Sequence, residues 1–205
     1  MGLRVTEKDV VLGNVYDKYG TGNPVYRALV RNYLSTLGRL ASVGKVDRLL
    51  DVGCGEGYVV DWLVSRLRPA SAAAIDLSPR MMRQATAEFG GIRFLSSDAS
   101  ALPLPSRSCD LVCCLELLEH VPAPEEVIRE LRRVCRGMAI LAVPREPIWR
   151  ALNLARGAYW STLGNTPGHV QHWSRAAFVR MVGRHFRIVE IRAPFPWTMV
   201  LCSIS

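Results

Sequence analysis

Hydrophobic residues gather into short runs from residue 48 onward, and each early run is followed by a segment whose apolar residues recur at helical spacing. Short apolar runs of this kind are typical of buried strands. Their alternation with amphipathic helices predicts a parallel sheet covered by helices on both faces. The expected strands are 48–53, 72–77, 92–96, 109–115 and 138–143, and the expected helices begin near residue 57 and span 78–89 and 124–135.

The alternation breaks at residues 144–173, which prolines and glycines punctuate throughout. We expect this segment to be an inserted lid over a substrate, with a short helix near 148–157. A helix over 174–185 and two strands at 186–192 and 198–204 follow. The two strands are expected to pair antiparallel at the edge of the sheet.

An amphipathic helix is also expected at 24–43, before the first strand. We therefore divide the chain into an N-terminal helical cap at 1–45 and one α/β domain at 46–205. Residues 16–23 are rich in glycine, asparagine and tyrosine and are candidates for folding over a ligand. A length of 205 residues with 49% hydrophobic residues suits a single domain of this kind.

The first strand leads straight into a glycine-rich turn, in the run LLDVGCGEGY at 49–58. Glycines let the backbone adopt positive φ and approach a ligand closely. Tyr58 stands where a dinucleotide-binding GxGxxG motif needs its third glycine, and the GK[ST] end of a phosphate-binding loop is absent. Asp51 and Glu56 make the turn acidic, so that it would repel a pyrophosphate and attract a cation. The turn therefore predicts a positively charged ligand.

This turn carries a resemblance to a known family. Asp51, Gly53, Cys54, Gly55 and Gly57 match the DxGxGxG signature of the class I S-adenosylmethionine (SAM)-dependent methyltransferases. The resemblance implies a Rossmann-like, doubly wound α/β fold, with a mostly parallel seven-stranded sheet and an antiparallel edge hairpin. It also implies SAM as the cofactor, whose sulfonium and ammonium groups would supply the expected positive charge.

Further cofactor contacts are expected where the strands end, because ligands of open parallel sheets bind beyond these ends. Asp76 closes the second strand and, by the resemblance, binds the two ribose hydroxyls; alternatively it only caps the helix that follows. Asp98 with Ala99 matches the position that reads the adenine edge, with Leu77 as an apolar wall. An aspartate such as Asp98 is also common in ordinary surface turns. Glu116 lies just past the fourth strand and belongs to the same match.

Two other segments refine the resemblance. The run CDLVCCLELLEHV at 109–121 resembles small-molecule methyltransferases similar to the enzymes of ubiquinone and menaquinone biosynthesis. The run at 130–144 resembles the family's RVLKPGG-type turn into the fifth strand and keeps Arg133, Val134 and Gly137. It lacks the proline and the second glycine of that turn, which leaves the start of the fifth strand open.

Three histidines are candidates for chemistry. Methyl transfer is an in-line displacement that depends mostly on positioning, but a hydroxyl acceptor must also lose a proton. His120, His169 and His172 could accept it, although each could equally anchor a loop or face solvent. A zinc site at His169 and His172 lacks a third ligand close in sequence, so no metal is expected.

Composition gives only weak evidence on the binding partners and the compartment of the protein. The formal net charge is +8, but the cations are 23 Arg and 3 Lys scattered along the chain, so nucleic acid is not an expected partner. The six cysteines show no paired CxxC spacing and are interpreted as reduced core thiols. With no long apolar run and no signal-peptide pattern, we expect a cytoplasmic protein.

The sequence thus predicts a SAM-dependent methyltransferase that acts on a small molecule, with a hydroxyl oxygen as the favoured acceptor. The arginines, together with Trp149, Trp160, Trp173 and Trp197, are compatible with an amphipathic or phosphate-bearing substrate. One alternative is methylation of RNA or protein, which the absence of a [DN]PP[YFW] motif after the fourth strand opposes. Another is a SAM-binding protein without turnover. A nicotinamide oxidoreductase is disfavoured by Tyr58, and the oligomeric state is left open.

Overall fold

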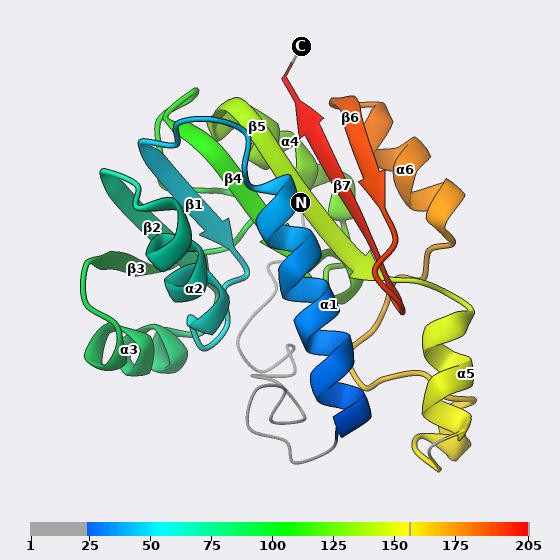
Figure 1. Cartoon of the computed structure of the whole chain (residues 1–205). Coiled ribbons are helices and arrows are strands. Elements are labelled where there is room, and N and C mark those ends of the chain that lie inside the picture. Colours follow the sequence, from blue (N-terminus) through cyan, green and yellow to red (C-terminus); the bar gives the residue numbers. More distant parts are fainter. Residues whose placement is uncertain (1–23, 156, 205) are drawn as a thin grey trace.

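A computed structural model gives the fold for residues 24–155 and 157–204. These residues form one sheet of seven strands with helices against it (Figure 1). The strands are β1 (Arg48–Val52), β2 (Ser71–Asp76), β3 (Ile92–Ser96), β4 (Cys109–Leu115), β5 (Cys135–Pro144), β6 (Arg187–Arg192) and β7 (Trp197–Ser203). Residues 1–23, which include the segment 16–23 and the first half of the predicted cap, lie outside the described residues.

The strands follow the order β3-β2-β1-β4-β5-β7-β6. Strands β1 to β5 are parallel, whereas β7 runs antiparallel to both β5 and β6. The predicted doubly wound, mostly parallel sheet with an antiparallel pair at one edge is confirmed. The order reverses between β1 and β4, and ligands of such sheets bind beyond the carboxyl ends of the strands at this point.

Helices cover both faces of the sheet, because the central strands are apolar on both sides. One buried cluster joins the sheet to α1 (Pro24–Leu40) and α2 (Tyr58–Leu67), and a second joins it to α4 (Pro124–Val134) and α6 (Arg175–Gly183). A further helix, α3 (Pro79–Glu88), packs on β2 and β3. Figure 1 shows α1 crossing the front of the sheet, with α4 and α6 behind it.

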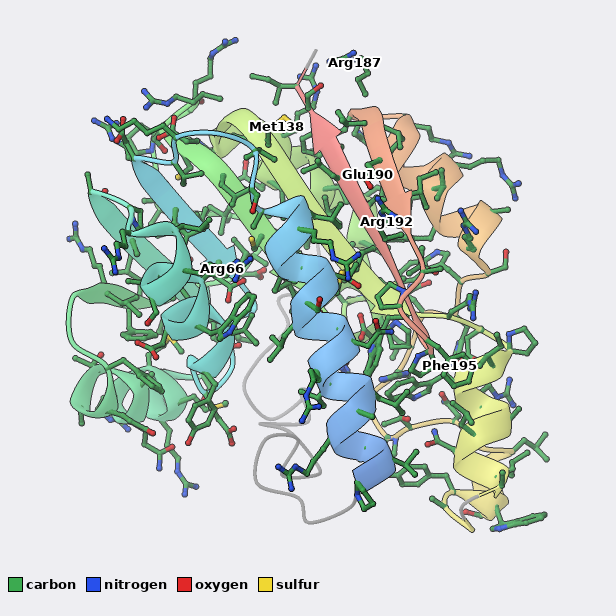
Figure 2. All side chains as sticks on the ribbon, in the orientation of Figure 1. Arg66, Met138, Arg187, Glu190, Arg192 and Phe195 are labelled. Carbon is green, nitrogen blue, oxygen red and sulfur yellow. The ribbon has the colours of Figure 1, made fainter. Side chains whose placement is uncertain are left out.

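The edge strand β6 carries charged residues that discourage pairing with another strand. Figure 2 shows Arg187, Glu190 and Arg192 along it, and Glu190 pairs with Arg192. The ladder to β7 is also irregular between Ile188 and Glu190. The sequence expectation for this pair of strands is therefore met, with β6 as the outer strand.

The start of β5 differs from the expected turn. The strand begins at Cys135, directly after α4 ends at Val134, instead of near residue 138. No room exists for a loop or a side chain here: a Cβ on Gly137 would lie 2.5 Å from the backbone oxygen of Asp110 on β4. Close approach of the two strands therefore explains why this glycine is needed where the turn's other residues are absent.

The predicted lid at 144–173 contains the short helix α5 (Ile148–Ala155) and the one-turn helix η3 (Trp160–Thr162). It lies against η2 (Leu118–His120), the turn that follows β4. No helix of the described residues is long and apolar enough to cross a membrane.

Candidate functional site

The glycine turn (residues 53–57) follows β1 and is held against β2. The amides of Gly53 and Cys54 both donate to the carbonyl of Ile75, at 2.7 and 3.1 Å. The glycines Gly53, Gly55 and Gly57 have φ values of 79°, 55° and 89°. Two of them are also needed for packing, since a Cβ would lie 2.8 Å from Leu117 at the first and 3.1 Å from Phe94 at the third.

Gly55 is different from the other two glycines, because a Cβ built there would meet no close contact among the described residues. The nearest atom to a Cβ built there is Met81 Cε at 3.8 Å. Beyond the turn, α2 begins at Tyr58 with no side chain capping its amides. A helix N-terminus carries a partial positive charge and donor groups, and the turn exposes backbone beside it. The turn thus offers a backbone surface on which a ligand can lie.

Asp76 connects this turn to the next helix. Its Oδ2 accepts from the amide of Gly55 at 3.0 Å, and its Oδ1 accepts from the amide of Ser78 at 3.1 Å. The hydroxyl of Ser78 caps α3 by accepting from Met81 N at 3.3 Å. Because Ser78 supplies the cap, the main structural work of Asp76 is to brace the turn at the carboxyl end of β2.

Asp51 is a buried acid directly below the turn, with 2% of its surface exposed. Its Oδ1 has no hydrogen-bond partner among the residues described. Burial, and then the nearby Asp76 carboxylate, raise the pKa of Asp51 from 3.8 to about 7. A cation in the turn would favour the ionised form of this acid. The chemistry of this donor set therefore fits a positively charged ligand.

The predicted adenine-side residues lie at the ends of β2 and β3. Asp98 Oδ1 accepts from both the amide and the hydroxyl of Ser100, each at 2.8 Å. This is the geometry of an ordinary aspartate turn, so one oxygen of Asp98 stabilises a surface turn. Leu77 is half-buried, and its carbonyl accepts from Ser96 Oγ at 3.0 Å, while Ala99 packs on the core.

Glu116 follows β4 with a backbone φ of 57°, an unusual conformation for a residue with a side chain. Its amide donates to the carbonyl of Ala142 on β5 at 2.9 Å, which holds the strained residue in place. Non-glycine residues in this region are concentrated at functional sites. The backbone of Glu116 turns the chain from β4 into η2.

Two of the three candidate histidines lie together. The rings of His120 and His169 are 4.8 Å apart and nearly perpendicular, and the ring of Trp149 stacks 6.3 Å from His169. His120 Nδ1 lies 3.0 Å from the carbonyl of Gly168 and must donate to it. His172 is exposed, and its Nε2 is hydrogen-bonded to Asn165 Oδ1 at 2.7 Å. The structure therefore separates His172 from the other two.

Glu119 joins the histidine pair; it belongs to the run at 109–121 that carries the resemblance, but the sequence assigned it no role. One ligand atom from each of Glu119, His120 and His169 lies within 4.8 Å of the others, so the three could hold a metal ion. The set shares only His169 with the pair weighed above, because Glu119 and His120 come from η2, outside the lid. A signal was present in the adjacent Glu119 and His120, but their partner is 49 residues away. The expectation that no metal is bound stays a prediction.

The lid segment is fastened to this cluster through η2. The amides of Val170 and Gln171 donate to the carbonyl of Glu119, at 2.9 and 3.1 Å. The side chain of Gln171 donates to the carbonyl of Pro122 at 3.2 Å. With the bond from His120 to Gly168, four contacts close the lid over the turn that follows β4.

Comparison with known proteins identifies the family. The description "Methyltransferase domain" applies to a family that matches residues 50–143. The chain is 30% identical over 128 residues to a malonyl-[acyl-carrier protein] O-methyltransferase of Marinomonas sp., which covers 61% of this chain and 47% of that protein. It is 36% identical over 104 residues to a ubiquinone biosynthesis O-methyltransferase of Pseudomonas putida, covering 48% and 43%. The chain spans about half the length of the curated relatives it matches.

Solved structures share the fold. A SAM-dependent methyltransferase from Aquifex aeolicus superposes with a TM-score of 0.68 at 16% identity, covering 89% of this chain and 94% of that one. Magnesium protoporphyrin IX methyltransferase from Synechocystis, solved with bound SAH, gives 0.66 at 19% identity, covering 91% and 90%. Such low identity shows the fold alone. The family match over residues 50–143, the sequence relatives and the acidic glycine turn together support a class I SAM-dependent methyltransferase with SAM as cofactor.

Proposed function

We propose that the protein transfers the methyl group of SAM to a hydroxyl oxygen of a small-molecule acceptor. The observation that carries this proposal is the pairing of His120, in the turn that follows β4, with His169 of the lid, beyond the same strand ends as the acidic glycine turn. A base next to the acceptor is needed for a hydroxyl, whose proton must leave. The relatives named above include two O-methyltransferases, which supports an oxygen acceptor.

The cofactor would be held by residues at the ends of the first four strands. We assign the methionine end to Asp51, the glycine turn and Cys54, and the ribose to Asp76. The adenine would lie at Asp98, Ala99 and Leu77, with Glu116 beside the methyl-bearing end. Two observations support this placement: the room at Gly55, and the burial of Asp51 with no hydrogen-bond partner for its Oδ1 among the described residues. When bound, SAM supplies an electrophilic methyl carbon on a sulfonium.

His120 is assigned as the general base. Its Nδ1 carries a proton because it donates to the carbonyl of Gly168, so in the neutral ring the lone pair is on Nε2. His169 packs edge-on against the ring and fixes its orientation. With SAM bound, the acceptor hydroxyl would give its proton to Nε2 while its oxygen takes over the methyl carbon, and the bond from that carbon to sulfur would break with its electron pair left on sulfur. Charge is conserved, because the positive charge of the donor ends on the His120 imidazolium.

The lid contributes by closing the site. Hydrogen bonds hold it over η2. The lid donates to the carbonyls of Glu119 and Pro122, and His120 donates to a carbonyl of the lid. Exclusion of water strengthens the electrostatic interactions inside a site and keeps the acceptor in attack geometry. Amphipathic or phosphate-bearing acceptors remain the proposed substrate class, and the six free thiols support a reducing compartment such as the cytoplasm.

The reaction class can be tested with the purified protein and SAM carrying a radiolabelled methyl group. We expect label to enter the small-molecule fraction of a metabolite extract, in a product that is stable as an ether or ester. Total RNA and a protein extract, supplied separately, should stay unlabelled. Label that enters only RNA or protein would contradict the proposal, and SAM binding without any transfer would favour the non-enzymatic alternative.

Replacing His120 by glutamine should lower kcat by about 100-fold, the usual contribution of a general base, while SAM affinity stays unchanged. Glutamine keeps a donor for the Gly168 carbonyl and removes the base. His172→Gln is the matched control, because it changes a histidine of the lid that lies outside the cluster, and its kcat should stay within about twofold. Steady-state kinetics and titration calorimetry with SAM measure both effects.

The effect of metal removal distinguishes a general base at His120 from a metal ion that Glu119, His120 and His169 would hold as a Lewis acid. We expect EDTA to leave the rate of the wild-type protein unchanged. A rate that EDTA abolishes and that added Zn²⁺ or Mg²⁺ restores would mean that Glu119, His120 and His169 hold an ion. That outcome would overturn the assignment of His120 as base and leave the methyltransferase activity standing.

A further inference from the structure

The lid presents two large apolar side chains to solvent at one turn. Trp160 and Leu163 are 67% and 68% exposed, and we call this pair the lid tip. Exposed single apolar residues are common, but here a tryptophan and a leucine three residues apart in one short turn are both exposed, which makes a small apolar patch. The patch is therefore a candidate for contact with an apolar environment.

The backbone of the lid tip is held firmly from below. Asn153 donates to the carbonyl of Gly164 at 2.8 Å, and Arg150 Nε donates to that of Leu163 at 3.0 Å. Gly164 is also packed closely, since a Cβ there would lie 2.4 Å from the carbonyl oxygen of Arg150. Polar groups thus anchor the turn while its apolar side chains face outward. A turn built in this way cannot easily fold these side chains inward.

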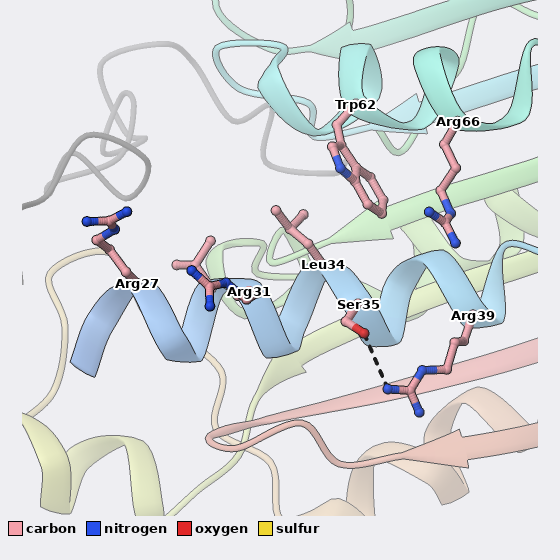
Figure 3. A pocket seen from close by; sticks show the side chains of 8 residues that line it. Arg27, Arg31, Leu34, Ser35, Arg39, Trp62 and Arg66 are labelled. Carbon is pink, nitrogen blue, oxygen red and sulfur yellow. Dashed lines mark hydrogen bonds between the residues drawn. The ribbon is translucent and has the colours of Figure 1, made fainter. Parts of the chain in front are cut away.

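A row of cations lies along α1. Arg27, Arg31 and Arg39 are spaced at multiples of four residues, on one side of the helix, with Ser35 completing the row. The row lines a groove of about 620 Å³ between α1 and α2, which also contains Arg66 beside the ring of Trp62 (Figure 3). None of the described residues that line this groove is acidic.

The chain segments that carry the two features contain no acidic residues. Residues 24–46 and 147–189 contain no aspartate or glutamate, although both segments are rich in arginine. Like charges four residues apart, such as Arg27 and Arg31, repel each other along a helix. No ion pair with a carboxylate relieves these arginines of α1 within the described part of the chain. An anionic partner would relieve this repulsion.

The two features belong to the same end of the molecule. Figure 1 shows the N-terminal end of α1 and the lid with α5 at the lower edge of the view. The ring of Trp197 links the two elements, 4.9 Å from Tyr33 of α1 and 5.6 Å from Trp149 of α5. The lid and the N-terminal part of α1, which carries Arg27 and Arg31, therefore lie at one end of the protein (Figure 1).

We propose that this side docks on a membrane surface rich in anionic phospholipid. The lid tip enters the interface between headgroups and acyl chains, where tryptophan is favoured, and the arginines of α1 bind headgroup phosphates. A nucleic acid would use the arginines but leaves the protruding lid tip without a role. The inference goes beyond the proposed function and does not require it, because docking needs neither SAM nor an acceptor.

Vesicle sedimentation tests the proposal. The protein should bind vesicles of phosphatidylcholine with phosphatidylglycerol, weakly bind pure phosphatidylcholine, and lose affinity as salt is added. Trp160→Ser with Leu163→Ser should weaken binding about tenfold, as should Arg27→Gln with Arg31→Gln. Val189→Ser, at a 47% exposed valine on β6, and Arg83→Gln with Arg93→Gln are the matched controls and should bind as the wild type does.

Insertion of the lid tip into the bilayer can be measured by the quenching of tryptophan fluorescence. Lipids with brominated acyl chains should quench the tryptophan fluorescence of the wild type, and Trp160→Phe should remove most of this quenching while circular dichroism stays unchanged. Vesicle binding that is equal in the lid-tip and wild-type proteins would overturn the proposal. So would an absence of vesicle binding together with arginine-dependent binding of a fluorescent RNA oligonucleotide, which would assign the row of α1 to nucleic acid.

Discussion

Replacing Asp76 by alanine is expected to weaken SAM binding by at least about 100-fold. The carboxylate accepts hydrogen bonds from the amides of Gly55 and Ser78, at 3.0 and 3.1 Å, and so holds the glycine turn in shape. Hydrogen bonds to a charged group contribute about 1.5–3 kcal/mol each, and each 1.4 kcal/mol is about tenfold in affinity. Alanine removes both bonds and also the proposed acceptor for the ribose hydroxyls. Titration calorimetry with SAM and with S-adenosylhomocysteine measures the loss.

Two further variants separate binding from folding. Asp76→Asn keeps one oxygen acceptor and should lose less affinity than alanine. Asp61→Ala is the matched control, because it removes a carboxylate from the first turn of α2 without touching the bonds to the glycine turn, and its affinity should stay within about twofold of the wild type. Circular dichroism checks that each variant is folded. An affinity of Asp76→Ala close to that of the wild type would show that SAM binding needs neither the bracing of the turn by this acid nor its carboxylate as a ligand contact.

The fold could be predicted because its signals are local. Buried runs and helical spacing mark each strand and helix within its own ten or so residues, and parallel strands of this kind admit few topologies. The start of β5 could not be predicted, since the residues expected for its turn are missing. There the strand follows α4 without a turn, and the packing of Gly137 on Asp110 of a neighbouring strand fixes its position. That contact depends on the pairing of β4 with β5, which no local pattern reports.

The site shows the same division. Asp51, Asp76 and the glycine turn were predicted because a strand end fixes where each one lies. The sequence could name the three histidines but not which of them lie together. His169 is 49 residues from His120 and contacts it only because the lid folds against η2, whereas His172 stays outside the pair. Likewise, arginines that look scattered in the sequence become one row with Arg66 only when α1 packs beside α2.

Replacing Asp51 by asparagine should make the ligand-free protein more stable at pH 8 and, because an unpaired amide then stands where the wild type holds a neutral carboxyl, less stable at pH 4. Burial raises the pKa of this carboxyl to about 7, whereas its unfolded value is 3.8. The unfolded chain therefore releases this proton first, and the wild-type fold loses stability as the pH rises from about 4 to 7, by about 1.4 kcal/mol per pH unit. Asparagine does not ionise. Allowing for its own unpaired amide, we expect a gain of about 2 kcal/mol in the free energy of unfolding at pH 8.

The same substitution should cost affinity for SAM and abolish its pH dependence. A cation in the glycine turn favours ionised Asp51, so binding to the wild type must also remove the proton that the free protein holds below pH 7. Between pH 6 and 8 the wild-type affinity should therefore rise about tenfold. In Asp51→Asn it should be weaker at pH 8 and nearly flat, and the variant also controls for ionisation of the ligand's own amine. Calorimetric titration at several pH values, with urea unfolding at the same pH values, measures both consequences. A wild-type affinity that does not vary over this range would mean that Asp51 is already ionised or faces away from the cation.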